Sequence, residues 1–297
     1  MNKLLKVFVF LSVLAALPLL SMQEWHLDVP YVPTKPEVVA KMLEMARVGK
    51  DDVLYDLGCG DGRIVITAAK LYGTRGVGVD INPERIRECH ENAKKEGVTS
   101  LVTFLQQDLF QTDFREASVV TLYLLSSVNL RLRPILFAQL RPGTRVVSHD
   151  FSMDTWKPDD SATVEAGGLT HEVYSWTIPA NASGSWGWTL PEGGKLVPCR
   201  LDLEQHFQVI SGKVNIGGQD LPLLNPTLVG DRIEFLIARE EGGKERRVIF
   251  AGRVVRNSMK GTMAVQGGAA KPAQKPWSAE RNPATMKPID TDGANRY

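Results

Sequence analysis

Three glycines at alternate positions follow a short apolar run in the first quarter of the chain. The run Val53-Leu54-Tyr55 leads into Asp56, and Gly58, Gly60 and Gly62 come directly after it. Glycine lets a backbone approach a ligand closely, and a helix that starts after such a turn offers free amide groups. The spacing differs from the Gly-x-Gly-x-x-Gly turn of nicotinamide dinucleotide sites, and a carboxylate at this position would repel a pyrophosphate. The pattern therefore favours a ligand that bears positive charge.

Two more carboxylates stand where the next two predicted strands end. Asp80 can accept hydrogen bonds from both hydroxyls of a ribose. Asp108 can accept one from an adenine amino group, with Ile81 and Leu109 on the two faces of the ring. The carboxyl ends of parallel strands share one edge of a sheet, so these acids should lie together with Asp56. Together they predict a site for S-adenosylmethionine, whose ammonium and sulfonium charges suit a carboxylate.

The elements that must position these residues alternate between apolar runs and helical stretches. Strands are predicted at 53–55, 76–79, 102–105, 119–124 and 145–148, and helices at 34–46, 63–71, 83–96 and 129–140. Thr34-Lys35-Pro36-Glu37 has the spacing of a capping box, which predicts that Thr34 caps the first of these helices. Strands and helices in alternation predict the doubly wound α/β class with parallel strands.

The pattern changes from about Ser183. Seven short strand candidates follow, separated by glycine, Asn-Pro and Gly-Asp turns, at 185–190, 195–203, 206–209, 213–216, 232–238, 246–251 and 260–265. This regular spacing predicts a small antiparallel β-domain over 183–266. The last residues, 267–297, are rich in Pro, Ala, Lys and Asn and are predicted to be a disordered tail.

Composition excludes several classes of protein. The 297 residues have a formal net charge of +1 and no basic stripe, which argues against a nucleic-acid substrate. The three cysteines, Cys59, Cys89 and Cys199, are too scattered for a disulfide framework or a zinc site, so no metal is predicted. Cys59 lies inside the glycine turn, where a small buried residue beside the cofactor is expected.

The amino terminus resembles a targeting segment. Lys3 and Lys6 precede an apolar run from Val7 to Leu20, which is too short for an ordinary membrane-spanning helix but suits a signal peptide. A helix buried against the domain is the alternative. Because the cleavage signal is weak, residues 1–22 are predicted to act as a signal peptide or, by preference, as a retained short membrane anchor. The expected location is membrane-associated or periplasmic, with the catalytic domain on the cytoplasmic face in the anchored case.

At this point the sequence resembles the class I S-adenosylmethionine-dependent methyltransferases, on Asp56 to Gly62, Asp80 and Asp108. The resemblance covers about half the chain and implies a catalytic domain within 23–180. It also implies a seven-stranded sheet whose last two strands form an antiparallel hairpin, here near Ala162–Ala166 and His171–Ile178.

A narrower resemblance concerns the methyl acceptor. Pro30-Tyr31-Val32-Pro33-Thr34, Tyr123-Leu124-Leu125 and Ser148-His149-Asp150-Phe151 are similar to segments of membrane-associated protein-lysine methyltransferases that modify ATP synthase subunit c or the adenine nucleotide translocase. The first segment also resembles the non-SET histone lysine methyltransferases. The resemblance implies a protein lysine as acceptor and a channel shaped by Tyr31, Pro33, Thr34 and Tyr123.

Several alternatives stay open at this level. Tyr31 and Pro33 could be a stiff linker, and His149 is more often an ordinary loop histidine than a base, so no catalytic base is predicted. A small-molecule or lipid methyltransferase competes with the lysine hypothesis, and so does an S-adenosylmethionine-binding protein without turnover. No Asn-Pro-Pro-Tyr or Asp-Pro-Pro-Tyr element follows the fourth strand, which argues against an adenine or glutamine acceptor. The oligomeric state is left undetermined.

Overall fold

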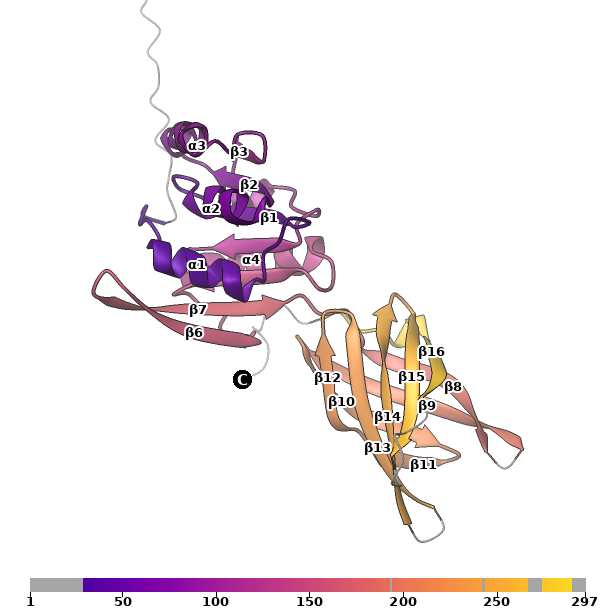
Figure 1. Ribbon diagram of the computed structural model, residues 1–297. Coiled ribbons are helices and arrows are strands. Elements are labelled where there is room, and N and C mark those ends of the chain that lie inside the picture. The colour runs from indigo at the N-terminus through magenta and orange to yellow at the C-terminus, as the bar shows by residue number, and fades with distance from the viewer. Residues whose placement is uncertain (1–28, 193, 242–243, 267–273, 290–297) are drawn as a thin grey trace, which may run out of the picture.

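The protein folds into two parts, each built on one sheet (Figure 1). The computed structural model describes residues 29–192, 194–241, 244–266 and 274–289. The predicted anchor at 1–22 lies outside the described residues. Within the described part of the chain, no helix is both long and apolar enough to cross a membrane.

The first part contains a seven-stranded sheet of order β3-β2-β1-β4-β5-β7-β6. All neighbouring strands are parallel except β7, which runs antiparallel to both β5 and β6. The predicted doubly wound sheet with a terminal antiparallel hairpin is confirmed. Its strands are β1 (Val53–Leu57), β2 (Arg75–Asp80), β3 (Val102–Gln106), β4 (Val119–Leu122), β5 (Arg145–His149), β6 (Asp160–Ala166) and β7 (Leu169–Thr177).

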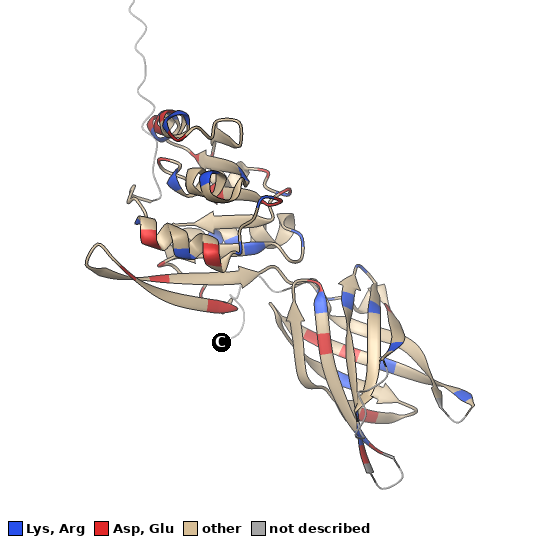
Figure 2. Cartoon of the chain, in the orientation of Figure 1, with Lys and Arg blue, Asp and Glu red and all other residues tan. Residues whose placement is uncertain are grey.

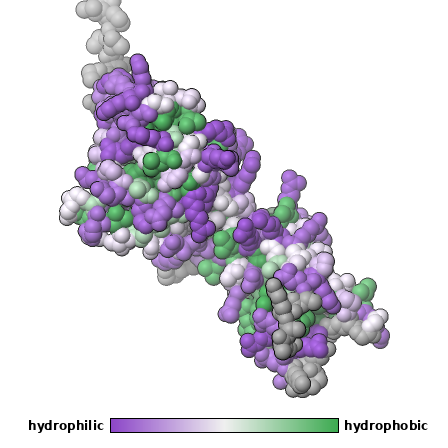
Figure 3. Space-filling view, viewed as in Figure 1, coloured by the Kyte–Doolittle hydropathy of each residue, from purple (hydrophilic) through white to green (hydrophobic). Residues whose placement is uncertain are grey.

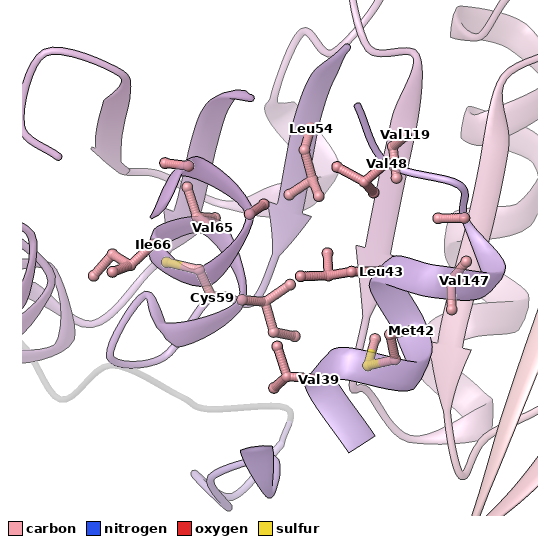
Figure 4. Close-up of a cluster of buried hydrophobic side chains, with 14 of the residues drawn as sticks. Val39, Met42, Leu43, Val48, Leu54, Cys59, Val65, Ile66, Val119 and Val147 are labelled. Carbon is pink, nitrogen blue, oxygen red and sulfur yellow. The ribbon is translucent and has the colours of Figure 1, made fainter. Parts of the chain in front are cut away.

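Helices cover both faces of this sheet because its central strands are apolar on both sides. Every residue of β1 and β4 is buried. Figure 4 shows one face, where Val39, Met42 and Leu43 of the first helix pack towards Leu54 of β1 and Val147 of β5. The helices are α1 (Pro36–Met45), α2 (Arg63–Tyr72) and α3 (Pro83–Glu96) on that face, α4 (Ser126–Gln139) on the other, and the 3-10 helix η1 (Leu109–Gln111).

The start of α1 differs from the prediction. Thr34 does not cap the helix: Lys35 is the N-cap residue and its side chain makes no capping hydrogen bond. The helix begins instead at Pro36, whose fixed φ suits a first helical position and which has no N–H that needs a partner. The Thr34 hydroxyl is therefore free for a tertiary contact, and it lies 3.2 Å from Nδ1 of His149.

The second part is a nine-stranded antiparallel sheet of order β11-β10-β9-β8-β16-β15-β14-β13-β12. It curls towards closure, and near its two edges the N–H of Leu223 donates to the carbonyl of Gly212. Its strands are β8 (Gly184–Glu192), β9 (Lys195–His206), β10 (Val209–Ile216), β11 (Gln219–Pro222), β12 (Leu224–Val229), β13 (Arg232–Glu241), β14 (Lys244–Val255), β15 (Ser258–Gln266) and β16 (Gln274–Arg281), followed by the 3-10 helix η2 (Pro283–Thr285).

Two predictions for this part are wrong. The predicted tail contains β16, which lies between β15 and β8 in the sheet. Its low apolar content concealed a two-residue alternation, in which Trp277, Ala279 and Arg281 are buried and their neighbours are exposed. The predicted strand at 206–209 is the turn between β9 and β10, where Phe207 has a φ of +51°.

Phe207 at that turn packs into the core of the first part rather than its own. Its side chain is 1% exposed. Its ring centroid lies 5.9 Å from that of Trp156 and 5.8 Å from that of Phe137. The neighbouring Gln208 accepts a 2.9 Å hydrogen bond from Nε1 of Trp156. The two sheets are therefore joined by a buried aromatic contact as well as by the connecting chain.

Charged residues of both signs occur throughout the described part of the chain. Figure 2 shows Lys and Arg interspersed with Asp and Glu over both parts of the chain. On the face shown in Figure 3, hydrophobic residues form small separate patches rather than one continuous area.

The aromatic contact between the parts generates a stability prediction. Phe207→Ala should lower the free energy of unfolding by about 3–5 kcal/mol, because it empties a buried site beside Trp156. Urea unfolding followed by tryptophan fluorescence measures this. Val209→Ala, two residues along and 65% exposed, is the matched control and should change stability by less than about 0.5 kcal/mol. Equal losses in the two variants would show that the parts do not share a core.

Candidate active site

A cavity of about 220 Å³ opens at the carboxyl ends of the parallel strands. Its wall is formed by the ends of β1, β2 and β4, the loops that follow β3 and β5, and the segment before α1. The twelve residues singled out in the sequence all line it: Tyr31, Pro33, Thr34, Asp56, Gly58, Cys59, Gly60, Asp80, Ile81, Asp108, Leu109 and Tyr123.

The glycine turn needs glycine at its alternate positions. Gly58, Gly60 and Gly62 have φ values of +84°, +54° and +78°, in the left-handed region that side chains disfavour. A Cβ on Gly60 would also stand 2.5 Å from the ring of Tyr31. The turn thus lets the N-terminal segment lie directly over the backbone at the cavity floor.

Asp80 is held by two backbone N–H groups, one from the glycine turn and one from the residue before α3. Its two carboxylate oxygens accept hydrogen bonds from the N–H groups of Gly60 and Asn82, each at 2.9 Å. Burial raises its pKa, and the backbone hydrogen bonds oppose the rise. The carboxylate is fixed in position, and each oxygen keeps a lone pair for a further donor such as a ribose hydroxyl.

Asp56 is the most deeply buried acid of the site, at 2% exposed. Within the described part of the chain, its side chain has one hydrogen-bond partner, the hydroxyl of Thr121 at 2.8 Å. Burial raises the pKa of this carboxyl to about 7, and the charges of Asp80 and Asp61 add to the rise against the bond from Thr121. A buried carboxylate is stabilised by a cation, so this end of the cavity fits the ammonium of S-adenosylmethionine.

Asp108, Leu109 and Ile81 also line the cavity and could hold the adenine. Asp108 accepts a hydrogen bond from the N–H of Phe110 at 2.9 Å, which caps η1 and fixes the carboxylate beside Leu109. Ile81 follows Asp80 on the neighbouring strand end and lines the same cavity. Cys59 is 5% exposed and its sulfur lies 3.8 Å from that of Cys89, so it fills space beneath the turn.

Three charged side chains pin the N-terminal segment over the cavity. The guanidinium of Arg85 lies 4.4 Å from the centroid of the Tyr31 ring. Arg63 donates to the carbonyl of Thr34 at 2.8 Å and forms a 2.7 Å ion pair with Asp61. These contacts place Tyr31 and Thr34 in the wall of the cavity, which argues against the interpretation of this segment as a stiff linker.

A buried cluster that the sequence did not reveal lies behind Tyr123. The ring of His149 stacks on that of Tyr123 with centroids 3.8 Å apart and is 1% exposed. His149 ends β5, so the reading of it as a loop histidine is wrong. Its Nε2 lies 3.0 Å from Nδ1 of His171, which lies 3.1 Å from Oδ2 of Asp150. Only the pairing of β5 with β7 brings His171 here, and no sequence spacing signals it.

None of these groups supplies a base to the cavity. Burial lowers the pKa of His149 to about 4, and this residue lies behind the wall rather than in it. Burial raises the pKa of both Tyr31 and Tyr123, helped by Asp61 and Asp150 respectively, so both phenols remain protonated near neutral pH.

Comparison with known proteins is consistent with this geometry. The ANTKMT methyltransferase domain matches residues 56–160. The chain is 52% identical over 151 residues to a protein-lysine N-methyltransferase of Saccharolobus islandicus, covering 50% of this chain and 94% of that protein. It is 34% identical over 133 residues to the mouse adenine nucleotide translocase lysine N-methyltransferase, covering 45% of this chain and 58% of that protein.

A solved structure is similar as well. It is an RNA methyltransferase from Salinibacter ruber in complex with S-adenosyl-L-homocysteine, with 59% identity and a TM-score of 0.46. The match covers 49% of this chain and 93% of that chain. None of these three matches spans more than half of this chain.

The buried carboxylate generates a pH prediction. A cation in the site needs Asp56 ionised, so binding of S-adenosylmethionine must displace the proton that this group holds below pH 7. Affinity should therefore fall as the pH is lowered from 7 to 5, by up to about tenfold per unit. Calorimetric titration over this range measures it.

Two variants test the assignment of that pH dependence. Asp56→Asn should bind weakly with an affinity that hardly changes with pH, since no carboxyl remains to titrate there. Asp51→Asn, an exposed position at the far end of β1, should retain the slope of the unaltered protein. A slope that survives in Asp56→Asn would assign it to another group.

Proposed function

Because the chain belongs to the protein-lysine N-methyltransferase family, we propose that it transfers the methyl group of S-adenosylmethionine to a lysine side chain of a protein. The chain is an S-adenosylmethionine-dependent methyltransferase. The observation that favours a lysine acceptor is the aromatic wall of the cavity, formed by Tyr31, Tyr123 and Phe151.

The chemistry needs a neutral amine. S-adenosylmethionine supplies an electrophilic methyl group on a sulfonium. A lysine in water has a pKa of ~10.4 and is protonated, but a dry aromatic surrounding disfavours the charged form. Tyr31, Tyr123 and Phe151 supply the aromatic rings, and the protein substrate would cover Tyr31, which is 43% exposed. The lysine proton leaves to solvent before the amine enters. The amine lone pair then faces the methyl group.

The rest of the rate enhancement comes from positioning the amine and the methyl group in line. Asp56 and Asp80 hold the cofactor from two strand ends, and the pinned segment around Thr34 closes the cavity above it. Fixing two reactants in line can contribute roughly 7–11 kcal/mol to lowering a barrier.

Labelling identifies the acceptor. Purified full-length protein, methyl-labelled S-adenosylmethionine and a whole-cell extract that includes membranes should place label in a protein band. Hydrolysis of that band should release methyl-lysine. Asp56→Asn serves as the matched variant with a defective site and should transfer little label.

Other distributions of label would contradict the proposal. Label in lipid or small molecules would indicate a lipid or small-molecule methyltransferase. Label in RNA would indicate a nucleic-acid acceptor. Cofactor binding without any transfer would indicate a binding protein.

For location we propose a membrane-associated enzyme that retains the segment 1–22, with its catalytic part on the cytoplasmic face. The basic start and the run from Val7 to Leu20 support membrane association. The lysines do not decide the orientation, and the cytoplasmic face is proposed because the cofactor is made in the cytosol. Cell fractionation should find the protein with membranes, and amino-terminal sequencing should begin at Met1. A mature chain that begins near Ala16 or Met22 and is free in the periplasm would contradict the anchor.

A further inference from the structure

Three ligand atoms of the cluster behind Tyr123 converge on one point. They are Nε2 of His149, Nδ1 of His171 and Oδ2 of Asp150. The two nitrogens are 3.0 Å apart, and the oxygen lies 3.2 Å from the first and 3.1 Å from the second. The three atoms thus form a nearly equilateral triangle, and none of the three residues lines the cavity.

Hydrogen bonds cannot satisfy all three edges of this triangle. With both imidazoles neutral, each ring has one proton and the carboxylate has none. If His171 donates to Asp150, its Nδ1 cannot also accept from His149. If both rings donate to Asp150, two N–H groups face each other at 3.0 Å. In every arrangement at least one short edge joins two lone pairs or two hydrogens, which is repulsive.

A cation bound between the three atoms removes the repulsion, because each atom then directs a lone pair to the ion. Nitrogen and oxygen ligands stand about 2.0–2.2 Å from a divalent transition-metal ion, which puts neighbouring ligands ~3.0 Å apart in an octahedral site and ~3.4 Å apart in a tetrahedral one. The observed edges of 3.0–3.2 Å fall in this interval. Two histidines and one carboxylate on one face are also a known set of ligands for such ions.

Two of the groups around the triangle suit a metal site, while Nε2 of His171 is buried without a hydrogen-bond partner in the described part of the chain. Nδ1 of His149 points to the hydroxyl of Thr34 at 3.2 Å, as the second nitrogen of a metal-bound histidine usually points to an oxygen. Oδ1 of Asp150 accepts the N–H of Glu172 at 2.9 Å, which leaves Oδ2 for the ion. Asp150 has a φ of +58°, an uncommon backbone conformation that directs its carboxylate back beside His149.

We propose that His149, Asp150 and His171 bind one divalent first-row transition-metal ion, of the kind exemplified by Zn²⁺ or Co²⁺. The side chain of Asp150 is 28% exposed, so water can reach the open side of the ion and complete its coordination. The ion lies behind Tyr123 and Thr34 and holds the acceptor wall from outside the cavity. The site depends on these residues alone and not on the identity of the methyl acceptor.

Metal titration of the full-length protein tests the site. Protein made without a histidine tag is stripped with a chelator and titrated with Co²⁺, followed by visible absorption and by elemental analysis after gel filtration. One Co²⁺ per chain is expected, with a d–d spectrum that Zn²⁺ abolishes. Asp150→Asn, which retains the tolerance for positive φ, and His171→Gln should each weaken binding at least about 100-fold.

Matched variants separate this site from incidental binding. His90→Gln removes an exposed histidine from α3 and should bind Co²⁺ as the unaltered protein does. Thr34→Val removes only the outer oxygen and should weaken binding about 10–100-fold. Circular dichroism and S-adenosylmethionine binding report whether each variant is folded. If the unaltered protein binds no ion at one equivalent, or if the folded Asp150→Asn and His171→Gln variants bind as tightly, the proposal is wrong.

Discussion

The buried carboxylate of Asp56 in β1 constrains the rest of the site, because its charge needs a compensating partner. Asp56 has been taken out of water with the Thr121 hydroxyl as its partner, and its pKa of about 7 measures the cost of ionising it there. A charge in such a place is stable only beside a cation. Below pH 7 this environment favours the protonated acid, and a cation placed beside it would favour the carboxylate. Recognition of a positively charged cofactor is therefore built into the sheet itself.

The acceptor wall depends on a second layer of contacts. Tyr123 is backed by the stacked ring of His149, which in turn contacts Thr34 and His171. Tyr31 is held by Arg85 from α3. The wall thus draws on the N-terminal segment, β5, β7 and α3, which are distant in sequence. This shared support can hold the aromatic side chains at fixed positions, which transfer between two aligned reactants requires.

The second sheet is joined to this arrangement through Phe207, whose ring completes a cluster around Trp156 on the face of the first sheet that α4 covers. The β-rich part is therefore structurally coupled to the catalytic part without lining its cavity. The matching family model covers residues 56–160, which lie in the first part of the chain.

The sequence by itself determined the first sheet and the gathering of the strand-end acids around one cavity. Asp56, the glycine turn, Asp80 and Asp108 are set by local strand-to-helix order, because parallel strands bring their carboxyl ends to one edge whatever the remaining contacts are. The prediction from sequence failed at β16, where burial of Trp277 and Ala279 outweighs a composition typical of disorder. It failed also at Thr34, where a tertiary contact with His149 replaces a local cap.

Only the tertiary structure decided the cluster of His149, Asp150 and His171. Twenty-two residues separate the two histidines, and the antiparallel pairing of β7 with β5 sets their distance. The same holds for Phe207, a turn residue in its own sheet and a core residue in the other. Local patterns determine which face of a strand is buried. What that face meets depends on the docking of whole elements, which short-range spacing does not encode.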